Sequence, residues 1–148
     1  MAEQDFNSQV IDEYRANGGR VGGMFENMSL LLLLLLLLLL HHTGARSGQE
    51  RIAPLAYAQD GSRYVIFASK AGAPTNPGWY HNLVAHPQTT IEVGTETLQV
   101  TAEEVTGEER RRLFDAQVRR APGFGDYQEK AGDRVIPVIA LTVTRDAE

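Results

Sequence analysis

The chain has 148 residues, of which 43% are hydrophobic and 22% charged, and these proportions favour one globular domain over residues 1–148. A formal net charge of −5 disfavours a general attraction to nucleic acid or acidic lipid, although a local basic pocket stays open. The absence of cysteine excludes disulfides, thiolate nucleophiles and cysteine-ligated metal centres.

The N-terminal segment has the pattern of an amphipathic helix. Phe6, Val10 and Tyr14 recur at helical spacing, which predicts a helix over residues 5–16, within a lead-in of residues 1–20. The segment is acidic and lacks the basic start and apolar stretch of a signal peptide. We therefore expect a cytoplasmic protein, with at most peripheral contact at the inner face of the cell membrane.

Eleven consecutive leucines occupy Leu30–Leu40. A membrane-spanning helix needs about 20 apolar residues, so the run is too short to be one. Identical residues carry no periodicity, and both a buried strand and a buried helical segment stay open. A strand usually has about 3–10 residues, so we expect part of the run to bulge, loop or continue past a sheet.

Two β-hairpins are predicted further along the chain. Ile52–Tyr57 and Tyr64–Phe67 are β-rich runs on either side of the turn signal Asp60-Gly61. Thr89–Val93 and Thr97–Val105 alternate around Gly94 in the same way, and Val135–Val143 is predicted as the final strand.

Helices are predicted between these strands. Residues 71–78 hold two prolines and form a loop, and Trp79–His86 follows as a short helix that ends at Pro87. Glu108–Arg120 is predicted as a charged helix whose buried side carries Leu113, Phe114 and Val118. About six strands, joined mainly as hairpins, favour an α+β or mainly β fold: an antiparallel sheet or small barrel with flanking helices.

The turn between Gly44 and Gly48 is a candidate anion site. Arg46 offers a bidentate fork, Ser47 a hydroxyl, and the glycines let main-chain N–H groups approach a ligand. Lys70 follows the strand that ends near Ser69. If that strand neighbours the one that ends near Thr43, both cations meet at one sheet edge. An ordinary hairpin turn with Arg46 in solvent stays open as the alternative.

Other chemistry is disfavoured. The four histidines have no metal-ligand spacing, so we predict no metal site. No GxSxG elbow is present, and the acidic pairs Glu103–Glu104 and Glu108–Glu109 are expected to be solvated surface. Trp79 beside an anion site suits a flat, phosphate-bearing ligand, although it serves equally well as core filler.

Five segments in order resemble the deazaflavin (coenzyme F420)-dependent nitroreductase family of actinobacteria: GGRVGG, TGARSGQERIAPL, ASKAGAPTNPGWYHNLVAHP, PGFGDYQ and IPVIAL. The resemblance runs from about Gln9 to Val143. It implies a split β-barrel like that of the flavin-binding pyridoxine-phosphate-oxidase superfamily. It also implies binding of reduced F420 and hydride transfer to a conjugated electrophile such as a quinone or enone.

The resemblance further implies which residues line the cofactor and substrate. Three groups of residues are implied as cofactor-binding. The first contacts the cofactor's tail and phosphate, the second contacts its ring and phosphate, and the third completes the site. These residues are Ala45, Arg46, Ser47, Gly48, Arg51, Ile52, Ala53, Pro54, Leu55 and Ala56; Phe67, Ala68, Ser69 and Lys70; and Gly78, Trp79, Tyr80, His81 and Asn82. Phe124 and Tyr127 match the substrate pocket, with Tyr127 as the candidate proton donor and simple packing as its alternative role.

Some features depart from the family. Ala121 and Phe124 stand where nitroimidazole-activating members carry tyrosines, and the leucine run is longer than the family's strand. The alternatives are an F420-binding protein without efficient turnover and an FMN- or haem-binding split-barrel protein. We expect a small-molecule partner and no nucleic acid, and a homodimer stays open.

Overall fold

A computed structural model describes residues 11–12, 15–16, 36–72, 75–132 and 134–146. Its elements in chain order are β1 (Leu36–Thr43), β2 (Glu50–Asp60), β3 (Arg63–Phe67), the 3₁₀ helix η2 (Lys70–Gly72), α3 (Gly78–Ala85), β4 (Gln88–Val93), β5 (Glu96–Val105), α4 (Gly107–Arg120), α5 (Gly123–Ala131) and β6 (Val138–Asp146). Of the predicted N-terminal helix, residues 11–12 and 15–16 are helical, and the remainder lies outside the described residues.

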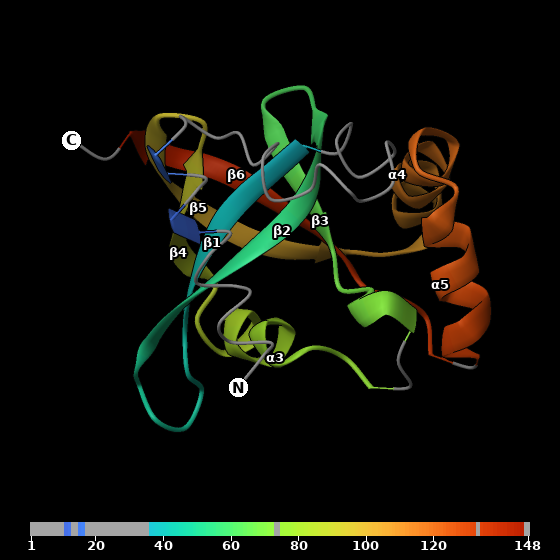
Figure 1. Cartoon of the computed structure of the whole chain (residues 1–148), viewed down its shortest axis with the longest axis horizontal. Coiled ribbons are helices and arrows are strands. Elements are labelled where there is room, and N and C mark those ends of the chain that lie inside the picture. Colours follow the sequence, from blue (N-terminus) through green and yellow to red (C-terminus); the bar gives the residue numbers. More distant parts are fainter. Residues whose placement is uncertain (1–10, 13–14, 17–35, 73–74, 133, 147–148) are drawn as a thin grey trace.

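Six antiparallel strands close into a barrel in the order β1-β2-β3-β6-β5-β4 (Figure 1). Pairing of β1 with β4 closes the ring, through Leu39 opposite Glu92 and Leu40 opposite Ile91. The two predicted hairpins are confirmed, because β2 pairs with β3 and β4 pairs with β5. Gly61 and Gly94 have φ values of 61° in their turns, a left-handed conformation that glycine adopts without strain.

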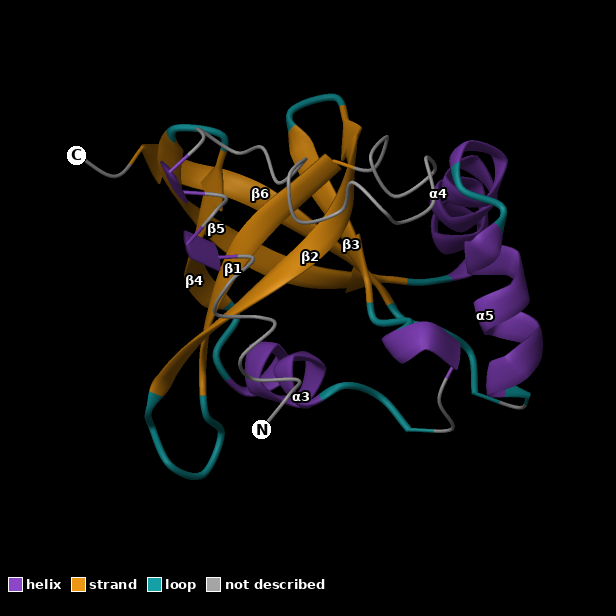
Figure 2. Ribbon diagram, in the orientation of Figure 1, coloured by secondary structure: helices purple, strands orange, loops and turns teal. Residues whose placement is uncertain are grey.

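Alternate residues of the strands supply two separate hydrophobic cores. One fills the barrel, and its members come from five of the strands, from Ala68 just after β3 and from α3: Leu38, Leu40, Ile66, Ala68, Trp79, Leu83, Ile91, Leu98, Val100, Ile139 and Leu141. The other lies between the barrel and α4 and α5, where Val65, Phe67, Val138 and Ala140 point outward from the same strands. Figure 2 shows α4 and α5 on one side of the barrel and α3 at its lower end.

The leucine run enters the barrel as a strand. Leu36–Leu40 belong to β1, and Leu38, Leu39 and Leu40 are fully buried. Leucine favours helices in isolation, so pairing on both edges with β2 and β4 decides the conformation here. The leucines before Leu36 lie outside the described residues.

Two sequence predictions need correction, and one helix was not predicted. The unpredicted helix is α5, which follows Pro122 and contains two glycines. In α4, Leu113 and Phe114 are buried as predicted, but Gln117 is buried and Val118 only half-buried. The last strand begins at Val138 and not at Val135, because Pro137 has no N–H for a ladder and Val135 is exposed.

Among the helices that the structure describes, none is both long and apolar enough to cross a bilayer.

The burial of Val65 in the second core predicts how its truncation affects the stability of the fold. Val65 is fully buried there, whereas Val135 is 63% exposed. Val65→Ala removes two buried carbon groups and leaves a cavity, so the free energy of unfolding should fall by at least about 1.6 kcal/mol. The same change at Val135 should cost less than about 0.5 kcal/mol. Urea unfolding of both variants checks this, and equal losses would contradict the assignment of Val65 to the core.

Candidate functional site

The loop between β1 and β2, residues 44–49, is a hydrogen-bonded hairpin turn. The Gly44 N–H donates to the Gln49 carbonyl at 2.8 Å, and the Gly48 N–H donates to the Gly44 carbonyl at 2.9 Å. Gly48 has a φ of 72°, which explains the glycine. Ala45, Arg46, Ser47 and Gly48 are all exposed, so this turn presents the Arg46 guanidinium to solvent, where a ligand can reach it.

Asn82 of α3 fastens this turn to the barrel. Its Oδ1 accepts the Ala45 N–H at 3.0 Å, and its Nδ2 donates to His42 Nδ1 at 3.0 Å. Because Nδ1 accepts, the proton of the neutral His42 ring is on Nε2. His42 is only 8% exposed, and burial, reinforced by the Arg51 charge, lowers its pKa. Asn82 therefore has a structural role beside the cofactor contact that the resemblance implies.

Next to this turn, β2 is paired with β1 but not with β3. Residues 50–57 of β2 pair with β1, but pairing with β3 starts only at Tyr57, opposite Ile66. In the described part of the chain, no strand pairs with the other edge of β2 between Glu50 and Ala56. The cofactor residues implied from Arg51 to Ala56 thus lie along an edge whose main-chain hydrogen-bonding groups face no strand among the described residues.

Lys70 lies at the other end of this edge, in η2. Its φ of 47° is left-handed, which is rare for a residue with a side chain and is often found at functional sites. Lys70 is exposed, and its Nζ donates to Thr75 Oγ1 at 3.3 Å. Gly72 packs directly against α5, since a Cβ there would lie 2.7 Å from the Tyr127 carbonyl oxygen. The lysine turn and Tyr127 are therefore neighbours.

Arg134, which the sequence analysis did not single out, holds the chain just before Lys70. Its Nη1 donates to the Ala68 carbonyl at 2.9 Å and to Asn76 Oδ1 at 2.6 Å, and its Nη2 donates to the Ser69 carbonyl at 2.7 Å. Desolvation lowers the pKa of Arg134. No sequence pattern links an arginine at 134 with carbonyls 65 residues earlier, so only the fold reveals it.

The implied substrate residues form an aromatic row in the outer core. The ring of Phe124 lies 5.7 Å from that of Phe67 and 5.4 Å from that of Tyr127, in edge-on contacts. Phe124 is buried, while Tyr127 is half-buried at the margin of the core. Of the two, Tyr127 is the one that a bound molecule could reach without repacking.

The remaining implied residues lie on α3. Trp79 is buried in the barrel core, which is the packing role that the sequence left open, and His81 is exposed. The Tyr80 hydroxyl donates to Glu104 at 2.5 Å, which raises the pKa of Tyr80 to about 12. These two residues line a pocket of about 220 Å³ together with Leu83, Val84, Pro87, Ala102 and Ile139. Glu103, Glu104, Glu108 and Glu109 are exposed, as expected.

The implied segments gather at one end of the barrel, but not in the way the sequence suggested. Arg46 and Lys70 would meet at one sheet edge only if the strands ending near Thr43 and Ser69 were neighbours, and this condition is not met, because β2 lies between β1 and β3. The turn that carries Arg46 and the η2 helix that carries Lys70 lie on opposite sides of α3 in Figure 1. The two cations therefore mark two ends of one region.

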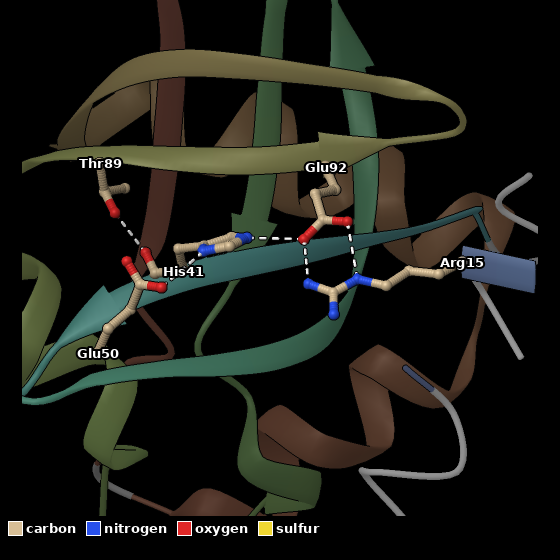
Figure 3. A network of polar contacts seen from close by, with 5 residues as sticks. All are labelled: Arg15, His41, Glu50, Thr89 and Glu92. Carbon is tan, nitrogen blue, oxygen red and sulfur yellow. Dashed lines mark hydrogen bonds and ion pairs between the residues drawn. The ribbon is translucent and has the colours of Figure 1, made fainter. Parts of the chain in front are cut away.

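A polar network around His41 links β1 to its two neighbouring strands, β2 and β4 (Figure 3). The ring of His41 lies 2.7 Å from Glu92 Oε2 and 3.3 Å from Glu50 Oε1, and Arg15 binds both oxygens of Glu92, at 3.0 and 2.6 Å. The Arg15 hydrogen bond lowers the pKa of Glu92. Thr89 Oγ1 donates to the His41 carbonyl. Among the described residues, no three acidic or histidine side chains gather as a metal site.

Comparison with known proteins identifies relatives. The family model for F420H(2)-dependent quinone reductases matches residues 7–143. A Mycobacterium tuberculosis F420H(2)-dependent quinone reductase is 40% identical over 134 residues, which cover 87% of this chain and 84% of that protein. A solved F420-H2 dependent reductase is 38% identical, with a TM-score of 0.65 over 71% of this chain and 92% of that one. A further solved relative, also 38% identical with a TM-score of 0.65, covers 71% of this chain and 78% of its own, and is a domain-swapped dimer.

More distant structures agree on the architecture. A Listeria innocua protein assigned as a pyridoxamine 5'-phosphate oxidase is 10% identical, with a TM-score of 0.55 over 84% of this chain and 96% of that chain. At this identity the likeness concerns the fold alone. It confirms the split β-barrel that the resemblance implied.

The buried His42–Asn82 contact predicts a pH effect. Because the pKa of His42 is lower in the folded chain than the ordinary 6.5, its contribution to stability is complete above pH 6.5. It is lost as the pH falls through the folded-state value. The melting temperature should therefore drop between pH 7.5 and pH 5, and His42→Gln should reduce that drop. His81→Gln, at an exposed histidine, is the matched control, and equal pH dependence in all three proteins would refute the prediction.

Proposed function

Because this chain belongs to the F420H(2)-dependent quinone reductase family, we propose that it transfers a hydride from reduced coenzyme F420 to a quinone. The observation that carries the proposal is the family match across nearly the whole barrel, from residue 7 to residue 143. It covers every segment to which the resemblance assigns a cofactor or substrate residue. The activity is therefore proposed for the site at the α3 end of the barrel.

The residues at this end fit a long, negatively charged cofactor. Arg46, Arg51 and Lys70 are exposed cations. Arg51 lies near the start of the β2 edge from Glu50 to Ala56, which runs from the Arg46 turn toward Lys70. Since the two ends are separated by α3, we assign Arg46 to the cofactor's tail and Ser69–Lys70 to its ring and phosphate. A bidentate guanidinium suits a carboxylate or phosphate, and a lysine suits phosphate as a point charge.

The bound deazaflavin would supply a hydride, which no amino-acid side chain can supply. The chain's own task is to orient the acceptor and to exclude water from the encounter. The buried aromatic row of Phe67 and Phe124 provides a rigid apolar floor for this. Basic groups near the reduced quinone stabilise the negative charge that it acquires.

The reduced quinone must also be protonated, and we propose Tyr127 as the donor. Its main chain contacts Gly72, two residues from Lys70, so the phenol belongs to the same region as the proposed cofactor turn. A tyrosine hydroxyl can donate a proton to the anionic oxygen of the reduced quinone and recover it from water.

A direct test uses the purified full-length chain. Titration with F420, followed by addition of menadione to the F420H2-loaded protein, should show saturable binding and oxidation of F420H2. Binding without oxidation would leave only a carrier role, and copurified yellow FMN would indicate another branch of the split-barrel fold.

Assembly and location extend this proposal. We propose a homodimer, since one solved relative is a domain-swapped dimer, and light scattering would detect it. We also propose a cytoplasmic protein that meets membrane-borne quinones by peripheral contact at most. Retention in the membrane pellet after a carbonate wash would contradict that location.

The assignment of Arg46 predicts a loss of affinity. Arg46→Ala removes a charged hydrogen-bond donor, which should weaken F420 binding by about 10- to 100-fold, corresponding to about 1.5–3 kcal/mol. Arg119→Ala removes the same charge from an exposed position in the last turn of α4 and should leave the Kd unchanged. Fluorescence titration measures both, and an unaltered Kd for Arg46→Ala would remove this residue from the site.

The role of Tyr127 predicts a change in turnover without a change in cofactor affinity. Tyr127→Phe keeps the ring in its packing against Phe124 and removes only the hydroxyl. If the hydroxyl donates the proton, kcat should fall by about 100-fold or more while the Kd for F420 stays the same. Unchanged turnover in stopped-flow oxidation of F420H2 would assign Tyr127 to packing alone.

A further inference from the structure

We propose that Arg134 is a positioning residue of the cofactor site: its guanidinium sets the shape of the Ser69–Lys70 turn and couples that turn to the helix of Tyr127. This inference rests on the proposed function, because it concerns the same site. Arg134 is not among the residues that the family resemblance implies.

The guanidinium of Arg134 serves three acceptors on two segments. It donates to the main-chain carbonyls of Ala68 and Ser69, and to Asn76 Oδ1 beyond the turn, at distances from 2.6 to 2.9 Å. Both segments flank η2, so one planar group holds the chain before and after Lys70. The fixed fork of arginine makes such multiple contacts possible, and a lysine ammonium cannot reproduce their geometry.

The turn needs such support because of its backbone. Lys70 has the left-handed φ of 47°, a conformation that is unfavourable for a residue with a side chain and persists only where its surroundings impose it. Carbonyls 68 and 69 immediately precede this residue. The Ser69 carbonyl accepts the Gly72 N–H at 2.9 Å, which closes the turn itself. Both carbonyls also accept hydrogen bonds from Arg134. Arg134 therefore determines where the Lys70 ammonium group is presented.

Arg134 is itself attached to α5. Its carbonyl accepts Gln128 Nε2 at 2.7 Å, and Gln128 Oε1 accepts the Ile136 N–H at 3.0 Å. Gln128 follows Tyr127 directly, and Gly72 packs on the Tyr127 carbonyl from the other side. Arg134 and the packing of Gly72 thus both link the proposed cofactor turn to the helix of the proposed proton donor.

Arg110 offers a matched control. It is also a partly buried arginine that donates twice to one main-chain carbonyl, that of Ile136, through Nε at 3.0 Å and Nη2 at 2.8 Å. Its guanidinium stacks 4.8 Å from the centre of the Phe114 ring. Its Nη2 also donates to Gln128 Oε1 at 3.2 Å. Arg110→Ala therefore removes a comparable structural anchor, including this contact with Gln128, but it leaves the bonds from the Arg134 guanidinium to carbonyls 68 and 69 in place.

The experiment compares Arg134→Ala, Arg134→Lys and Arg110→Ala in the full chain, by fluorescence titration with F420 and by amide hydrogen exchange without cofactor. We expect the Kd for F420 to rise about 10- to 100-fold in Arg134→Ala and to stay within about twofold of wild type in Arg110→Ala. Arg134→Lys should lie between, and added guanidinium chloride at low millimolar concentration should partly restore binding to Arg134→Ala. Amides 70–72 should lose protection only in the Arg134 variants.

The outcomes separate the two proposals. Wild-type Kd values in both Arg134 variants, or equal losses in Arg134→Ala and Arg110→Ala, would overturn the positioning role. If the wild-type protein does not bind F420, the proposed function fails, and the exchange of amides 70–72 then decides the positioning role alone. If Arg134→Ala does not fold, the same comparison is made with Arg134→Lys, whose unchanged Kd and protection would equally overturn it.

Discussion

The unequal lengths of two neighbouring strands shape this molecule. β2 has 11 residues and β3 has 5, so β2 stays paired with β1 over its first half while no strand that the structure describes pairs with its other edge there. Three features follow from this mismatch. The β1–β2 turn projects beyond the barrel, the chain after β3 turns away through η2, and α3 lies at the end of the barrel between them (Figure 2). Polar main-chain groups and the exposed cations Arg46 and Lys70 therefore occur together at one end of an otherwise acidic protein.

The remainder of the fold makes this end rigid. Alternation along each strand sends one set of side chains into the barrel and the other set under α4 and α5, so two cores share the same strands. Each core reaches the site by a different route. Trp79 anchors α3 from inside the barrel, whereas Phe67 and Phe124 anchor α5 and Tyr127 from outside. A redox protein that relies on a borrowed cofactor needs this kind of fixed geometry more than it needs reactive side chains.

The sequence predicted the local features of the fold well and its long-range features poorly. Asp60-Gly61 and Gly94 mark turns whose conformation the two residues largely decide, so both hairpins could be predicted. The leucine run could not be assigned, because its conformation depends on partners in β2 and β4. α5 was missed because its two glycines and preceding proline are usual in loops, whereas packing against Gly72 and Val118 stabilises a helix there. The contacts of Arg134 and Asn82 join residues far apart in sequence, and no local pattern announces them.

The leucine run also raises the question of what keeps β1 in register. Sliding a strand of identical residues past its neighbour exchanges leucine for leucine, so side-chain fit inside the barrel scarcely distinguishes one alignment from the next. The alignment must come from the polar residues that end the run. His41 is held beside Glu92 on one neighbouring strand and Glu50 on the other (Figure 3). His42 is held by Asn82. The contacts of these two histidines thus fix the register of β1. This register in turn sets the position of the Arg46 turn relative to α3.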